Sequence, residues 1–191
     1  MQTLGLSDST PRTENRLKAL FWPTIRTEGD LDYVTQQGFW ICTIVGAAGL
    51  GLGLLVTRGW LTIFVAAEGL FYYLAGNGVR MRSRAAAVLA FAAYLLSGIV
   101  LHTGFNVVRL IFLALLLANV RGIWLSASWA PDPSEPPLFR LNETWRDKLA
   151  DQLPQWLWPK TKILFFVLAG VEMLLLALAL FPIVPTGNNL G

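Results

Sequence analysis

Three ionisable side chains interrupt long apolar stretches of this sequence: Glu68, Arg109 and Glu172. A charge at the centre of a membrane helix costs about 2.5 to 3.5 kcal/mol, so it needs a charged partner, water or neutralisation. At about 1.5 Å per helical residue, Glu68 and Arg109 lie about 8 to 12 Å from one end of their stretches, and Glu172 lies about 14 Å from the other. Since Glu68 and Arg109 reach nearly the same depth, we expect an ion pair between them.

Further polar residues accompany this set. Asn106 and His102 precede Arg109 at spacings of three and four residues, which would place all three on one helical face. The supporting candidates, which lie near the same depth in neighbouring stretches, are Tyr72, Tyr94 and Ser97. Two interpretations remain open: a structural salt bridge that joins helices, and an outward-opening polar cavity or ion pathway.

Glu172 has no polar neighbour within one helical turn in either direction. If it faces Arg109, it competes with Glu68 for a single cation. Two acids that share one arginine can hold one titratable proton between them, as proton-coupled transporters require. Proton handling is therefore one hypothesis for these three residues.

Other chemistry has little support in the sequence. His102 is the single histidine and Cys42 the single cysteine, so a cysteine metal cluster and an internal disulfide are both excluded. The patterns GxSxG, HExxH and the Walker lysine loop are absent. We predict no catalytic residue, no metal and no cofactor, and we expect Cys42 to be a small core residue.

The composition indicates a membrane protein. Hydrophobic residues make up 54% of the chain, charged residues 14%, and the mean hydropathy is +0.53, whereas charged residues make up about 25% of soluble domains. The net charge is +3, but the basic residues lie between apolar stretches and not in one stripe. That arrangement encodes membrane topology and argues against nucleic-acid binding.

Five stretches have the length and apolarity of a transmembrane helix, which needs about 20 residues. They are residues 38–56, 60–79, 85–101, 104–124 and 163–184. We therefore predict an all-α integral membrane protein with a bundle of five transmembrane helices.

Five spans place every Lys and Arg except Arg58 and Arg109 on one side. By the positive-inside rule, the N-terminus is cytoplasmic and the C-terminus outside, in a plasma or bacterial inner membrane. The N-terminus lacks the pattern of a cleavable signal, so the first span is expected to direct insertion. Four segments follow: cytoplasmic residues 1–37, a four-helix region at 38–125, a cytoplasmic segment at 126–162, and the fifth helix with an outer tail at 163–191.

Two cytoplasmic segments have the three- and four-residue spacing of amphipathic interfacial helices. Their apolar residues are Leu17, Leu20, Phe21 and Ile25 in the first, and Leu138, Leu141, Trp145, Leu149 and Leu153 in the second. They either anchor to the membrane surface or dock onto a partner subunit. Trp156, Trp158 and Lys160 are expected at headgroup level.

Small residues mark one helix-packing face in the first span. Gly46, Gly49 and Gly53 share a face with Cys42, and the last two glycines form a GxxxG motif. Gly69 and Gly76 of the second span are candidate counterparts, although a second copy of the chain is an alternative. Upstream, Thr27 and Asp30 have capping-box spacing, which predicts that the first helix begins well before its apolar part.

Two functions of different classes follow from these features. The chain is either a transporter or channel subunit, expected to form a homo-oligomer, or a non-catalytic accessory or assembly subunit of a larger membrane complex. Three mid-membrane ionisable residues in a chain of 191 residues favour the first. The expected partners are the lipid bilayer and either further copies or other membrane subunits.

Overall fold

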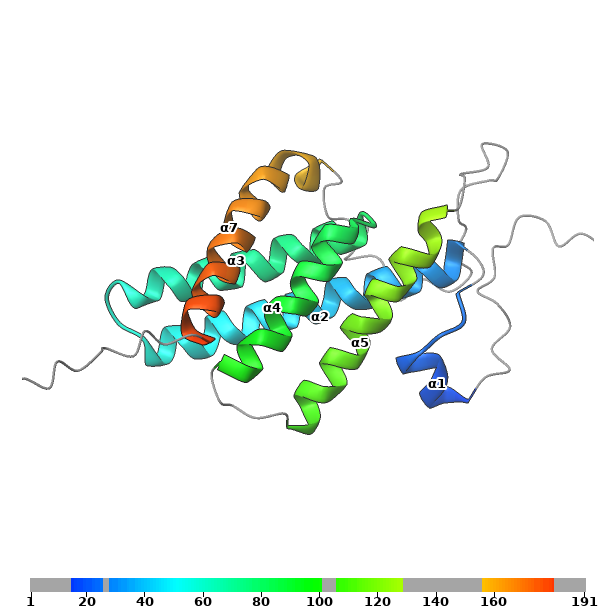
Figure 1. Ribbon diagram of the computed structural model, residues 1–191, viewed down its shortest axis with the longest axis horizontal. Helices are drawn as coiled ribbons and strands as arrows, with labels where there is room; N and C mark the ends of the chain where they lie inside the picture. Colours follow the sequence, from blue (N-terminus) through cyan, green and yellow to red (C-terminus); the bar gives the residue numbers. More distant parts are fainter. Residues whose placement is uncertain (1–14, 26–27, 101–105, 129–155, 181–191) are drawn as a thin grey trace, which may run out of the picture.

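The computed structural model describes residues 15–25, 28–100, 106–128 and 156–180 (Figure 1). These residues form helices and contain no strand. The helices are α1 (Arg16–Phe21), α2 (Glu28–Val56), α3 (Leu61–Arg80), α4 (Arg84–Val100), α5 (Val107–Leu125) and α7 (Leu157–Leu180), and a 3₁₀ turn, η1 (Ser126–Ser128), follows α5.

Each of the five predicted apolar stretches contains a helix, with ends that differ from the sequence prediction. The first helix starts at Glu28, ten residues before its apolar part, as the capping-box spacing predicts. The last helix starts at Leu157 and includes residues 157–162, which were predicted to be cytoplasmic. Pro159 is compatible with this start, because proline is tolerated in the first helical turn.

Three of these helices, α2, α5 and α7, are long and apolar enough to cross a membrane. Helix α4 is apolar but has only 17 residues. Helix α3 has 20 residues but carries Glu68, Asn77 and Arg80, which lower its apolarity. The described part of the chain is therefore an all-helical protein with three helices suited to a membrane span.

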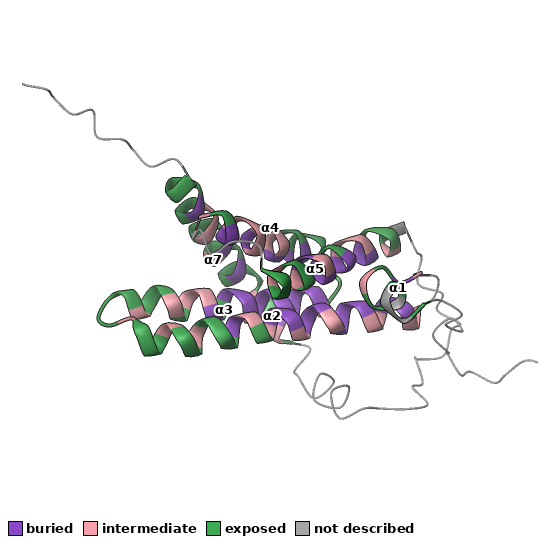
Figure 2. Ribbon diagram, turned by 90° about the horizontal axis from the view of Figure 1, so that it is seen from below, coloured by how far each residue is buried: buried purple, intermediate pink, exposed green. Residues whose placement is uncertain are grey.

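The helices form two layers (Figures 1 and 2). Helices α2 and α3 pair as a long antiparallel hairpin, and α4, α5 and α7 lie across one face of it. The core between the layers contains buried side chains from α3, α4, α5 and α7, including Phe71, Ala90, Leu116 and Phe165. The rings of Phe71 and Phe165 stack at 5.6 Å, which fixes α7 against α3.

One half of the α2–α3 hairpin projects beyond the second layer. Figure 2 shows this half, around residues 47–64, mainly in the colour of exposed residues. Leu55 is 83% exposed, Trp60 68% and Ile63 70%. Helix pairing within the hairpin is therefore the principal packing that the described residues provide here.

Glycines allow the two hairpin helices to approach closely. A Cβ on Gly46 would lie 2.9 Å from the carbonyl oxygen of Gly69, and one on Gly76 would lie 3.1 Å from that of Phe39. Gly53 faces Val65 of α3. The placement of Gly49 on this face is wrong: nothing lies within 4 Å of its Cβ position, because it sits about 60° around the helix from Gly46.

The segment before α2 packs against other helices of this chain. Ile25, predicted to be interfacial, is buried with Val34, and Gly122 of α5 lies next to both side chains. Trp158, expected at headgroup level, does not lie on the surface: its ring is buried against Gly78 of α3. The second predicted interfacial helix, at residues 138–153, lies outside the described residues.

Replacing Gly46 with leucine is expected to destabilise the hairpin by about 1 to 3 kcal/mol, because the added atoms meet backbone on α3. Gly49→Leu is the matched control, since its site is open, and leucine is the better helix former. Thermal unfolding in detergent, followed by circular dichroism, measures both. Equal losses in the two variants would contradict the assigned contact face.

Candidate functional site

Arg109 lies in the first turn of α5. The side chain of Asn106 accepts a hydrogen bond from the backbone N–H of Arg109 at 2.8 Å and caps the helix. The helix therefore begins at Val107, and the prediction that Asn106 continues a helical face toward His102 is wrong for Asn106. Asparagine is among the preferred N-cap residues, so this start had a signal in the sequence. His102 lies outside the described residues.

The side chain of Arg109 is fixed against α4. Its Nη2 donates to Ser97 Oγ at 2.7 Å and to the Tyr94 carbonyl oxygen at 3.2 Å. The guanidinium carbon lies 4.9 Å from the centroid of the Tyr94 ring. Gly98 makes room for it, because a Cβ there would lie 2.6 Å from Arg109 Nε. Hydrogen bonds from a charged donor are about twice as strong as neutral ones, so this cluster joins α4 firmly to α5.

Glu68 lies near this cluster but outside it. Glu68 and Arg109 are close enough to interact electrostatically. Within the described part of the chain, however, no ion pair joins them. The predicted direct ion pair is therefore wrong. Its physical reason is the direction of the guanidinium, which turns onto α4, whereas Glu68 belongs to α3.

Glu172 of α7 lies near the same region, because α7 packs against α3. It interacts electrostatically with Glu68, and both carboxylates act on the phenol of Tyr72. Glu68 and Tyr72 are four residues apart, so they share one face of α3. Within the described residues, these three side chains have no hydrogen-bond or ion-pair partner.

An aromatic contact links the acids to the arginine. The rings of Tyr72 and Tyr94 meet edge to face at 6.4 Å, and Tyr94 lies under the guanidinium of Arg109. Tyr72 is only 2% exposed, whereas Glu68 and Glu172 are half-buried. We call this set the polar centre; its members are Glu68, Tyr72, Tyr94, Ser97, Arg109 and Glu172.

Asn119 is one of several buried polar residues that the sequence prediction missed. Asn119 of α5 is 1% exposed, and its Nδ2 donates to the Val34 carbonyl oxygen at 2.6 Å. A Cβ on Gly38 would clash with its amide, so the glycine makes room for it. An asparagine within an apolar stretch carries the same kind of signal as Glu68, and it could have been identified in that way. It lies ten residues, or about 15 Å, along α5 from Arg109.

The groups of the polar centre are suited to electrostatic interaction and proton transfer. Among the described residues, no three His, Cys, Asp or Glu side chains come together to hold a metal ion. Two carboxylates and a phenol can instead accept and donate protons. The fixed guanidinium supplies a positive charge nearby.

Replacing Ser97 with alanine removes the acceptor of the 2.7 Å bond from Arg109. The expected loss of stability is about 1.5 kcal/mol, the lower end for hydrogen bonds to charged groups. Ser126→Ala is the control, because that hydroxyl donates only to a carbonyl one turn back in the same segment. Thermal unfolding in detergent compares the two. A Ser97→Ala variant as stable as the control would show that the α4–α5 cluster adds little.

Comparison of the chain with known protein families, with curated proteins and with solved structures finds no significant match. The strongest functional feature of the described residues is the polar centre, where the half-buried acids Glu68 and Glu172 lie close enough to interact electrostatically.

Proposed function

We propose that this chain is a subunit of a small membrane transporter or channel whose polar centre handles a proton or another small cation. The observation that carries this proposal is the proximity of Glu68 and Glu172, on different helices and without a hydrogen-bond partner among the described residues. Two negative charges repel each other strongly at low dielectric. A shared proton or bound cation relieves that repulsion.

In this proposal, Arg109 is an electrostatic neighbour of the acids and not their direct partner. Its hydrogen bonds to Ser97 and Tyr94 hold the guanidinium on α4, and from there it acts on Glu68. A fixed positive charge lowers the cost of ionising one acid while the other keeps its proton. Glu68 and Glu172 can then exchange protons without forming a permanent salt bridge.

We further infer that all five helices from α2 to α7 cross the membrane, with a cytoplasmic N-terminus. Consecutive helices run in alternating directions, and the start of α2, the α3–α4 turn, the end of α5 and the start of α7 lie toward the top and right of Figure 1. This end carries six described basic residues that follow the positive-inside rule. They are Arg80, Arg82, Arg84, Arg121, Lys160 and Lys162.

The projecting half of the hairpin favours an assembly of several chains. Its exposed apolar residues, Leu55 and Ile63 among them, lack a second layer within the described part of this chain. A homo-oligomer would enclose a conduction path, whereas an accessory subunit would use the same surface to meet a different chain. Detergent purification separates the two: a stable homo-oligomer supports transport, and loss or co-purification of unlike subunits supports the accessory function.

Proton flux into proteoliposomes tests the transport proposal. Glu68→Gln and Glu172→Gln are each expected to lower the flux by about 100-fold or more, the range for loss of a positioned proton donor or acceptor. Glu28→Gln makes the same chemical change in an exposed ion pair with Arg82 and should leave the flux unchanged. A pH-sensitive dye inside the vesicles provides the readout.

Two results would contradict the proposal. One is a flux in wild-type proteoliposomes no greater than in empty liposomes under an imposed pH gradient or potential. The other is an unchanged flux in both Glu68→Gln and Glu172→Gln, with folding confirmed by thermal unfolding.

A further inference from the structure

The turn between α3 and α4 concentrates positive charge at one end of the bundle. It is closed by backbone hydrogen bonds from Arg82 to Val79 at 2.9 Å and from Ser83 to Gly78 at 2.8 Å, with Arg82 in the left-handed region at φ 57°. Within five residues this turn presents Arg80, Arg82 and Arg84. We call the part of the molecule around this turn, the end of α5 and the start of α7 the basic end.

At or near the basic end, a basic side chain lies over the ring of each of three tryptophans. The pairs, with the distance from the cation to the ring centroid, are Arg121 and Trp22 at 4.7 Å, Arg84 and Trp124 at 5.7 Å, and Lys160 and Trp156 at 4.9 Å. The tryptophans are 45%, 58% and 58% exposed. The pairs therefore lie on the surface and not in the core.

The two arginines of these pairs keep donors for a ligand. Arg121 Nη1 donates to the Pro23 carbonyl oxygen at 3.0 Å, and Arg84 Nη2 donates to that of Ala127 at 3.5 Å. A guanidinium has five N–H donors in a plane, so each retains donors at its edge. The ring contact and the backbone bond together fix the plane before a ligand arrives.

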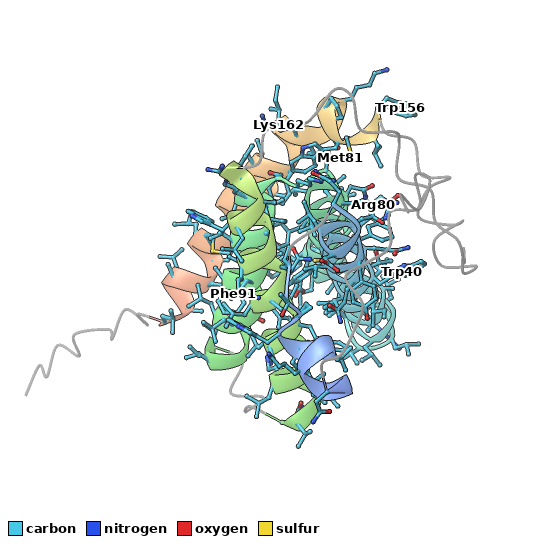
Figure 3. All side chains as sticks on the ribbon, turned by 90° about the vertical axis from the view of Figure 1, so that its right-hand side faces the viewer. Trp40, Arg80, Met81, Phe91, Trp156 and Lys162 are labelled. Atoms are coloured by element: carbon cyan, nitrogen blue, oxygen red, sulfur yellow. The ribbon has the colours of Figure 1, made fainter. Side chains whose placement is uncertain are left out.

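Most basic residues of the basic end have no acidic partner among the described residues. Arg82 pairs with Glu28, but Arg84, Arg121, Lys160 and Lys162 have no ion pair within the described residues. Figure 3 looks at the molecule from this side, and Arg80, Met81, Trp156 and Lys162 lie in its upper half. An anionic ligand would supply the missing charge.

Apolar side chains border the pairs. Leu20 is 38% exposed, Met81 44% and Leu125 46%, and they belong to the same helix ends or the turn that the tryptophans and arginines occupy. A ligand that meets this surface therefore needs an anionic group next to hydrocarbon. Indole rings at the boundary between headgroups and acyl chains fit the same ligand.

We propose that the basic end is a binding surface for anionic phospholipids, in which phosphate groups contact Arg84, Arg121 and Lys160 and acyl chains cover the neighbouring apolar residues. The three cation–tryptophan pairs lie on α1, α4, α5 and α7 or on the segments next to them. Separate headgroups occupy them more readily than one rigid ligand. This proposal does not depend on the transport function.

The opposite end of the bundle provides a matched control. Trp60 is 68% exposed there and meets Phe64 edge to face at 5.5 Å. Arg58 lies two residues away, but within the described residues no cation lies over the Trp60 ring. This end has an exposed tryptophan and a basic residue without the paired arrangement.

Native mass spectrometry of the full chain, released from detergent with equal phosphatidylglycerol and phosphatidylcholine, tests the proposal. The wild type is expected to retain phosphatidylglycerol preferentially. In the variant with Arg84→Gln, Arg121→Gln and Lys160→Gln, this preference falls by about fivefold for each charge removed. Arg58→Gln should retain the wild-type preference.

A second measurement on the wild type covers the case in which the triple variant fails to fold. Raising the salt concentration during lipid loading should reduce the preference for phosphatidylglycerol, because phosphate contacts at a surface are screened. A wild type that binds both lipids equally would overturn the proposal. So would a folded triple variant that keeps its preference, or a preference that salt does not change.

Discussion

The fixed position of one guanidinium determines the rest of the polar arrangement. An arginine within an apolar bundle must be paired, hydrogen-bonded or hydrated, because its charge cannot be removed at ordinary pH. Here Arg109 obtains two hydrogen bonds and a ring contact from α4, and Gly98 leaves the space for them. The guanidinium is thereby held on α4, near Glu68 but not in an ion pair with it. That carboxylate is left to interact with Glu172 and Tyr72.

This arrangement connects packing to the proposed chemistry. A direct salt bridge between Glu68 and Arg109 would neutralise both groups. Glu68 would then have little tendency to bind a proton. With Arg109 bound to α4, the acids on α3 and α7 remain half-buried and near each other. The stacking of Phe71 on Phe165 holds these two helices against each other. The same contacts that stabilise the bundle therefore bring the two carboxylates together.

The two ends of the molecule differ in their surface side chains and in their packing. At the basic end, tryptophans and cations are paired on helix ends, and a buried amide, Asn119, joins α5 to α2. At the other end, the α2–α3 hairpin extends alone, and close packing at Gly46 and Gly53 holds its two helices together. The basic end suits contact with lipid headgroups, and the projecting hairpin suits assembly in the membrane.

The sequence predicted some of these features and not others, for definite reasons. The length of each long apolar stretch predicted a helix there. The rise per residue predicted similar depths for Glu68 and Arg109. Which side chains meet depends on the rotation of each helix and on its neighbours, so the Arg109 contacts on α4 could not be derived. The neighbours of Glu172 could not be derived either, because nothing near it in the sequence indicates that it lies next to α3. The early start of α2 was predictable because capping depends on local spacing.

We propose that Glu68 and Glu172 share one proton while Arg109 stays bound to α4. Infrared spectroscopy of the reconstituted protein tests it through the carbonyl stretch of a protonated carboxyl group in the membrane interior. We expect one such signal near neutral pH, which changes in Glu68→Gln and also in Glu172→Gln. Two signals that titrate independently, each lost in only one variant, would contradict it.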